Sequence, residues 1–76
     1  MSLVEALQEL SKARRYVVKG ERCLSHQRKI VERLEREGND PLPAIMFLEH
    51  LEDMQDTYVA HRDQIEARVL MIIKPE

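Results

Sequence analysis

The sequence predicts an all-α protein, a coiled-coil-like antiparallel hairpin of two helices that makes a single domain of residues 1–76. Two observations support this fold class. Apolar or small residues recur with heptad spacing along two long segments, and one cluster of helix-breaking residues, Gly38 to Pro43, separates the segments. A heptad repeat gives each helix one packing stripe. A short connection then makes the two helices antiparallel neighbours.

The first helix is predicted over about residues 2–37, followed by a turn at 38–40. Ser2 and Glu5 have the spacing of a capping box, which satisfies N–H groups at a helix start. The packing stripe consists of two rows, Leu3, Leu10, Val17, Leu24 and Val31, and three residues after each of these Ala6, Ala13, Gly20, Gln27 and Leu34. Gly38 suits the left-handed residue that commonly follows a helix.

The second helix is predicted over about residues 41–73. Asp40 is a good N-cap, and Pro41 then occupies the first helical position, where its missing N–H has no partner to lose. The packing stripe repeats every seven residues at Ala44, Leu51, Tyr58, Ile65 and Ile72, with Phe47 or Leu48, Met54, and His61 or Arg62 between them.

Folding the chain about residue 39 or 40 predicts which residues of the two helices meet. The expected neighbours are Gly20 with Tyr58, Ala13 with Ile65, and Ala6 with Ile72. Small residues of the first helix thus face large residues of the second, as in a closely spaced pair. Glycine inside a helix costs roughly 0.5–1 kcal/mol relative to alanine. We expect Gly20 to be tolerated because it leaves room for the Tyr58 ring.

One polar residue, Gln27, falls in the packing stripe of the first helix. Gln55 is the nearest polar candidate opposite it. A pair of buried amides fixes the register of two helices at some expense of stability. We therefore expect Gln27 and Gln55 to serve a structural role rather than to contact a ligand.

Several apolar residues lie outside the packing stripes. Tyr16, Cys23 and Ile30 flank the stripe of the first helix and, together with Phe47 and Met54 of the second, form a predicted self-association face. Further apolar residues gather at the open end of the hairpin, among them Leu7 and Leu70. A chain of this length buries only about 60–65% of its unfolded surface, so its own core is small. A homodimer that forms a four-helix bundle would cover the self-association face.

Basic residues form one row along the first helix. Eight positions are spaced 3-4-3-4-3-4-3, and seven of them are Lys or Arg: Lys12, Arg15, Lys19, Arg22, Lys29, Arg33 and Arg36, with His26 as the eighth. This spacing keeps side chains on one helix face. Residues 2–37 carry nine Lys or Arg and six Glu, a net charge of +3, whereas residues 38–76 carry three Lys or Arg and eight Asp or Glu, a net charge of −5.

The charge pattern has two interpretations. The faces are either solvated surfaces whose opposite signs favour correct helix pairing, or the basic row is a docking surface for an anionic partner. The second helix has an outer face of the opposite sign, formed by Glu49, Glu52, Asp56, Asp63 and Glu66. The sequence leaves both interpretations open.

No set of residues predicts catalysis, a cofactor or a metal ion. Cys23-x-x-His26 supplies half of a zinc-ligand set, and no second such pair occurs in the sequence. Glu49, His50, Glu52 and Asp53 cluster, but without the Glu-x-x-His motif of di-iron bundles. We expect the cluster to be a solvated surface.

One class of small helical enzyme bears on this expectation. Chorismate mutases use buried Arg and Lys between helices of a dimer, and the residues near the packing stripes here include Arg14, Arg28, Arg62 and Gln55. That family has three helices, and its spacing is not reproduced. We expect no enzymatic activity.

The sequence also indicates a compartment. The lone Cys23 excludes an internal disulfide and fits a reducing cytoplasm. No apolar run approaches the roughly 18–20 residues that span a membrane. We expect a cytoplasmic protein without a membrane partner.

Five short motifs support a resemblance to a group of bacterial proteins. They are Val18-x-Gly20-Glu21, Gln27-Arg28-x-x-Val31, Gly38-x-Asp40, Leu51-Glu52-x-x-Gln55 and His61-Arg62-Asp63. Between about residues 17 and 66 the chain resembles short uncharacterised helical-hairpin proteins of rhizobial-type bacteria. The resemblance implies a small bacterial cytoplasmic protein and carries over no functional residues.

The sequence therefore predicts a non-catalytic helical module that self-associates as a homodimer and binds a protein partner. The alternative is a binder of nucleic acid or another polyanion through the basic row. Only Tyr16 among aromatic residues borders that row, so base stacking is not indicated. The pI of about 5.9 also argues against strong non-specific binding of nucleic acid.

Overall fold

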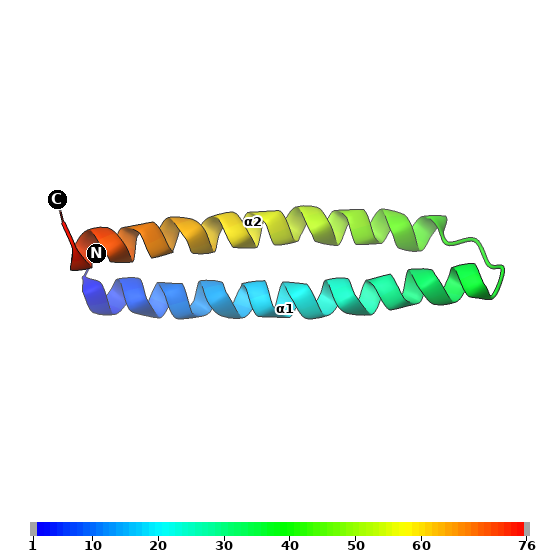
Figure 1. The fold of residues 1–76 in the computed structure, drawn as a ribbon, viewed down its shortest axis with the longest axis horizontal. Helices are drawn as coiled ribbons and strands as arrows, with labels where there is room; N and C mark the ends of the chain where they lie inside the picture. Colours follow the sequence, from blue (N-terminus) through cyan, green and yellow to red (C-terminus); the bar gives the residue numbers. More distant parts are fainter. Residues whose placement is uncertain (1, 76) are drawn as a thin grey trace.

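The structure, a computed structural model, describes residues 2–75 and contains two α-helices, α1 (Leu3–Arg36) and α2 (Leu42–Ile73). The helices run side by side in opposite directions, with both ends of the chain at the same end of the molecule (Figure 1). The pair is a rod of 57 × 16 × 14 Å. No strand occurs within residues 2–75, and the predicted all-α class is confirmed. Neither helix of this part combines the length and apolarity needed to cross a membrane.

Local hydrogen bonds define both ends of α1. Glu5 donates its backbone N–H to the Ser2 hydroxyl at 3.2 Å, and that hydroxyl donates to the Glu5 carboxylate at 3.2 Å. At the other end Gly38 has a φ of +73°, which favours glycine. The Gly38 and Asn39 N–H groups bond to the carbonyls of Glu35 and Leu34, the pattern of a Schellman motif.

α2 begins one residue later than predicted, because Pro41 rather than Asp40 is the residue before its first helical position. Asp40 nevertheless contributes to the start of α2. Its side-chain Oδ1 accepts the backbone N–H of Leu42 at 3.0 Å, so it satisfies an N–H that the helix itself leaves unpaired. Pro41 already has a near-helical φ of −85°, and its carbonyl accepts the Ile45 N–H at 2.9 Å. α2 therefore begins directly after the short turn.

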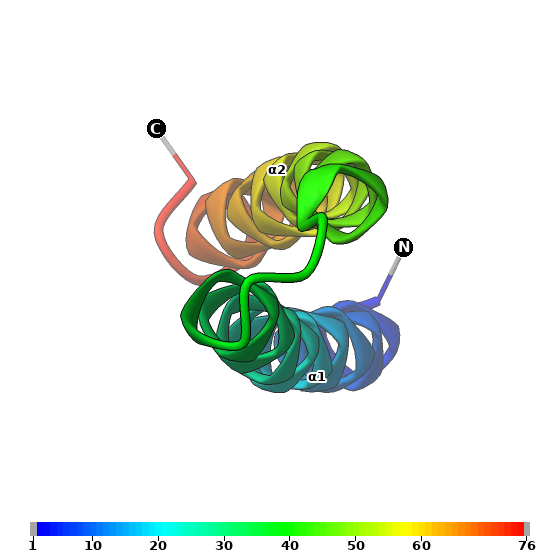
Figure 2. The ribbon, with the colours of Figure 1, turned by 90° about the vertical axis from the view of Figure 1, so that its right-hand side faces the viewer.

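The core lies between the helices and is densest toward the open end. Ala6, Leu10 and Ala13 of α1 are buried in one cluster with Ile65 and Val69 of α2, and Ile72 packs against this cluster. The predicted neighbours Ala13 and Ile65, and Ala6 and Ile72, belong to this cluster or pack against it. Viewed from the turn, the helices are inclined to each other (Figure 2). Each helix buries one stripe and leaves the rest of its surface exposed.

The packing stripe of α2 differs in part from the predicted one. Between the heptad residues lie Leu48, Gln55, Arg62 and Val69, which are buried or half-buried. The prediction of Met54 in the stripe is wrong, since its side chain is 38% exposed, and Phe47 is 51% exposed. Gln55 takes the inward position because its carboxamide fits against Gly20.

The predicted partner of Gly20 was also wrong. Gln55, rather than Tyr58, occupies the space beside Gly20: a β-carbon there would meet Oε1 and lie 2.6 Å from Cδ of Gln55. Tyr58 instead stacks on Tyr16, with ring centroids 5.5 Å apart. A flat carboxamide fits the narrow gap between the helices, whereas the larger ring remains at its margin.

The two buried glutamines do not pair with each other as predicted. Gln27 Nε2 donates to the Ala44 carbonyl at 3.0 Å, and Gln55 Nε2 donates to the Val17 carbonyl at 2.9 Å. Each amide therefore reaches the backbone of the opposite helix. Two separate bonds at two levels fix the register, because each requires one helix turn to face one particular glutamine.

Candidate interaction surfaces

The two edges along which α1 and α2 meet have different chemistry. At one edge, the charged edge, Arg14 and Glu66 form an ion pair at 3.3 Å, and Gln55 Nε2 donates to Glu21 Oε1 at 3.1 Å. The opposite edge, the apolar edge, carries the predicted self-association residues Tyr16, Cys23, Ile30, Phe47 and Met54. The charged edge is therefore well solvated, whereas contact of the apolar edge with water is unfavourable.

The middle of the apolar edge is a shallow cavity of about 210 Å³. Its lining includes Tyr16 and Cys23 from α1 and Met54 and Tyr58 from α2. Cys23 is exposed, and Tyr16 is 53% exposed. The structure thus brings together three of the five predicted residues.

The other two predicted residues lie on the same heptad rows, nearer the turn. Ile30 follows Cys23 by seven residues, and Phe47 precedes Met54 by seven. Ile30 is half-buried, whereas Phe47 is exposed and stacks on His50 with ring centroids 6.4 Å apart. Heptad spacing keeps residues on one helix face, so the apolar edge continues toward the turn.

The basic row is exposed along its whole length. Lys12 lies 3.8 Å from Glu9, and Arg15 donates to the Ser11 hydroxyl at 3.2 Å. Within residues 2–75, no ion pair involves the remaining predicted residues, which are Lys19, Arg22, Lys29, Arg33 and Arg36. Their positive charges therefore face solvent and can attract an anionic surface.

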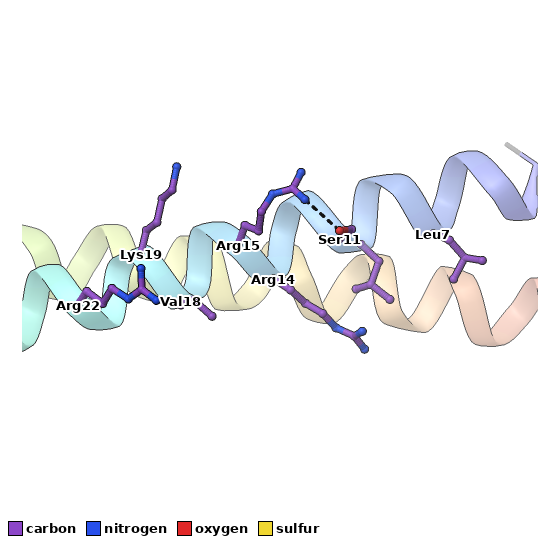
Figure 3. Close-up of a pocket in the computed structure, with 8 residues that line it drawn as sticks. Leu7, Ser11, Arg14, Arg15, Val18, Lys19 and Arg22 are labelled. Carbon is purple, nitrogen blue, oxygen red and sulfur yellow. Dashed lines mark hydrogen bonds between the residues drawn. The ribbon is translucent and has the colours of Figure 1, made fainter.

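A groove on α1 combines part of the basic row with apolar side chains. It has a volume of about 450 Å³ and is lined by Leu7, Leu10, Ser11, Arg14, Arg15, Val18, Lys19 and Arg22. Figure 3 shows Arg15 and Lys19 on one flank and Arg14 on the other. We name it the cationic groove: apolar side chains form its floor, and four cations surround them.

Sequence reasoning missed this groove, although a signal was present. Leu7, Ser11, Arg14 and Val18 follow one another at spacings of 4, 3 and 4, which place them on one helix face. Leu7 is 46% exposed and Val18 is 50% exposed. From the sequence, Leu7 is placed at the open end of the hairpin, and neither Leu7 nor Val18 is connected with the basic residues beside it.

The outer face of α2 carries the opposite charge. One row spaced 3-4-3-4-3-4-3 mirrors the basic row, and all its residues are exposed: Met46, Glu49, Asp53, Asp56, Ala60, Asp63, Ala67 and Leu70. We name it the acidic row. Of the other predicted acidic residues, Glu52 is exposed and Glu66 is half-buried in its pair with Arg14. Asp63 pairs with the adjacent Arg62 at 3.0 Å.

The described residues include no candidate metal centre. No three His, Cys, Asp or Glu side chains within residues 2–75 gather where they could share an ion. Comparisons with protein-family models, with curated proteins and with solved structures found no match. The function is therefore inferred from the apolar edge, the basic row and the cationic groove.

Proposed function

We propose that this protein is a non-catalytic interaction module in which two hairpins pair through their apolar edges to form a four-helix bundle. The bundle then presents its charged outer faces to a protein partner. One observation carries the proposal: an edge of large apolar side chains, including Tyr16 and Phe47, each more than 50% exposed. An isolated hairpin would hold these side chains in water.

The free energy of apolar burial supports pairing. Covering a large side chain contributes roughly 1.5–3 kcal/mol relative to full exposure, and about half of this remains to be gained at half-exposed residues such as Tyr16 and Phe47. The core within one hairpin is limited to one stripe per helix. A second copy would therefore add substantially to the apolar surface that this chain buries.

The arrangement of the apolar edge also suits a two-fold dimer. Tyr16 and Ile30 lie seven residues before and after Cys23, so the strip extends about equally to both sides of it. A two-fold axis at the level of Cys23 and Met54 would place each half of the strip against the other half of the partner copy. Interfaces with this symmetry use the same surface on both subunits.

Sedimentation equilibrium at tens of micromolar tests the dimer. We expect the intact protein to be a dimer and Met54→Glu to shift it toward monomer. Met46→Glu is the matched control, because Met46 is an exposed methionine of α2 that lies on the acidic row. A wild-type monomer at this concentration, or equal effects of the two substitutions, would contradict the proposal.

The second candidate function is binding of nucleic acid or another polyanion. The observation that favours it is the line of five cations without ion pairs in the described chain, from Lys19 to Arg36. Phosphate binding would be steeply salt-dependent, with a slope of about 0.9 per neutralised phosphate. The acidic row opposes such binding at long range.

Fluorescence anisotropy with a labelled duplex at several salt concentrations separates the two functions. We expect no binding even at low salt, which leaves a protein partner. Duplex binding that is lost on charge reversal at Arg15, Arg22 and Arg33, with helicity and dimerisation unchanged, would support the polyanion binder instead.

A further inference from the structure

The cationic groove has the chemistry of a docking site for an acidic amphipathic helix. Arg14, Arg15, Lys19 and Arg22 line it, and no acidic residue does. Leu7, Leu10 and Val18 supply an apolar floor. A helix lies in such a groove with its apolar residues against the floor and its acids against the cations. A nucleic-acid backbone would pair with the cations but would leave the apolar floor unmatched.

The acidic row of α2 has this complementary chemistry. It combines four acids, Glu49, Asp53, Asp56 and Asp63, with the small or apolar residues Met46, Ala60, Ala67 and Leu70. Alanines at two positions of the row allow another helix to approach closely. All eight residues are exposed, so nothing in the described hairpin covers the row.

The groove also matches one segment of the acidic row in length. The groove extends over the 16 residues from Leu7 to Arg22, which is about 22 Å along a helix that rises 1.5 Å per residue. The segment of the row from Asp56 to Leu70 extends over 15 residues, or about 21 Å. The rest of the row, toward Met46, extends beyond the groove.

The register of the hairpin sets complementary residues at the same level. Contacts of Arg14 with Glu66 and of Gly20 with Gln55 show which parts of α1 and α2 are level. A second copy placed alongside without a shift along the axis keeps these levels. Within about one turn, the resulting neighbours are Arg15 with Asp63, Arg22 with Asp53 or Asp56, and Leu7 with Leu70.

We propose that the cationic groove of one copy receives the acidic row of a second copy of this chain. This contact is separate from pairing through the apolar edge and does not depend on it. Because each copy has one groove and one acidic row on opposite helices, the contact is heterologous and can repeat. A contact of about four helical turns is small, and salt screens its charges. The association is therefore weak and favoured by low ionic strength and high protein concentration.

A charge-swap experiment tests this contact directly. The groove variant is Arg15→Glu with Arg22→Glu, and the row variant is Asp56→Arg with Asp63→Arg. In sedimentation velocity at low salt, we expect the wild-type protein to form species at least about twice the mass of those at high salt. Each variant alone should lose these species, because its altered surface then has no net charge and its substituted side chains face residues of like charge.

An equimolar mixture of the two variants should recover the larger species. The carboxylates introduced at positions 15 and 22 of one variant then face the guanidinium groups introduced at positions 63 and 56 of the other, and the two unaltered surfaces remain complementary. The matched control is Lys29→Glu with Arg36→Glu, which changes the charge of the basic row equally outside the groove. This control should retain more low-salt assembly than the groove variant.

Three results would overturn the proposal: a wild-type mass that does not depend on salt, a mixture that fails to recover the larger species, or variants that assemble like wild type. A groove that instead bound a labelled duplex or a synthetic acidic helix, without wild-type assembly, would also exclude the second copy as occupant. Met54→Glu separates the two contacts, since it should abolish the high-salt dimer and leave low-salt association through the groove.

Discussion

The carboxamide of Gln55 occupies the space beside Gly20 that a β-carbon would need. A β-carbon on Gly20 would collide with Oε1 of Gln55 and lie 2.6 Å from its Cδ. The same carboxamide donates through Nε2 to the Val17 carbonyl at 2.9 Å and to Glu21 Oε1 at 3.1 Å. Gly20 therefore admits a buried amide of α2 into the surface of α1, at the level where that amide can bond to the backbone.

This relationship predicts the effect of Gly20→Ala. In an exposed helix the substitution would stabilise by about 0.5–1 kcal/mol. Here the new methyl group would displace the Gln55 amide, which would weaken two hydrogen bonds worth about 0.5–1.5 kcal/mol each. We expect the free energy of unfolding, measured in urea, to stay unchanged or to fall by about 1 kcal/mol.

The matched control for Gly20→Ala is the same substitution in a Gln55→Ala background. Without the amide, the β-carbon has room, and Gly20→Ala should stabilise by about 0.5–1 kcal/mol. The double-mutant cycle should thus give a coupling energy of about 1 kcal/mol or more between the two positions. Additive effects would mean that Gly20 and Gln55 do not limit each other.

Gln27 gives a second prediction, which concerns the stability of the hairpin and the choice of helix register. Its amide is buried and bonds to the Ala44 carbonyl, which as a helical carbonyl also accepts an N–H within α2. Gln27→Leu should raise the free energy of unfolding by about 1 kcal/mol, because an apolar residue replaces a polar one in the packing stripe. Gln27→Ala should lower it by about 1 kcal/mol through the lost bond.

The same two Gln27 variants test specificity. If the amide helps to select the register, the Leu variant should be stabler but should sediment as more than one species. A Leu variant that is as unstable as the Ala variant would show that the hydrogen bond contributes more than apolar packing does.

Much of the fold could be predicted because its signals are local. Ser2, Gly38 and Asp40 act on N–H and carbonyl groups within five residues of themselves, so residue type and position suffice to identify them. Heptad spacing likewise reports which face of each helix is apolar without knowledge of the other helix. The Gly38 turn between two such segments then leaves an antiparallel pair as the simplest arrangement.

The rotation of α2 could not be predicted in the same way. Met54 and Gln55 are adjacent, and apolarity alone favours the methionine for the inward position. Gln55 is nevertheless the buried residue, because Gly20 on the other helix provides a gap and Val17 provides an acceptor. This preference arises only when the two helices pack together, so the periodicity of α2 alone cannot predict it.

Of the candidate surfaces, the basic row could be predicted from the sequence and the cationic groove was not. The basic row followed from spacing alone, and its members are exposed as that spacing implies. The cationic groove was missed, although the spacing of Leu7, Ser11, Arg14 and Val18 places these residues on one helix face. Spacing shows that they share a face, but the hollow between their side chains appears only in the folded structure.

Gly38 gives a prediction that contrasts with Gly20. It has a φ of +73°, and a β-carbon there would meet nothing within 4 Å, so the constraint is conformational rather than steric. Gly38→Ala should lower the free energy of unfolding by about 1–2 kcal/mol. Gly38→Asn should cost less, because asparagine tolerates the left-handed conformation better. Equal losses in urea unfolding of the two variants would contradict this explanation of the turn.

Cys23 offers a chemical test of how the hairpin pairs. Its thiol is exposed on the apolar edge of a single hairpin, in the cavity that Met54 also lines. If two copies pair through this edge, the thiol is covered in the dimer and reacts only in the monomer. The rate of alkylation by a maleimide should therefore fall about tenfold as the protein concentration rises through the dissociation constant and well beyond it.

The matched control is Cys23→Ser with Ser25→Cys, which moves the thiol to an exposed position of α1 away from the apolar edge. Its rate should be independent of concentration, and a wild-type rate that is equally independent would exclude pairing through the apolar edge.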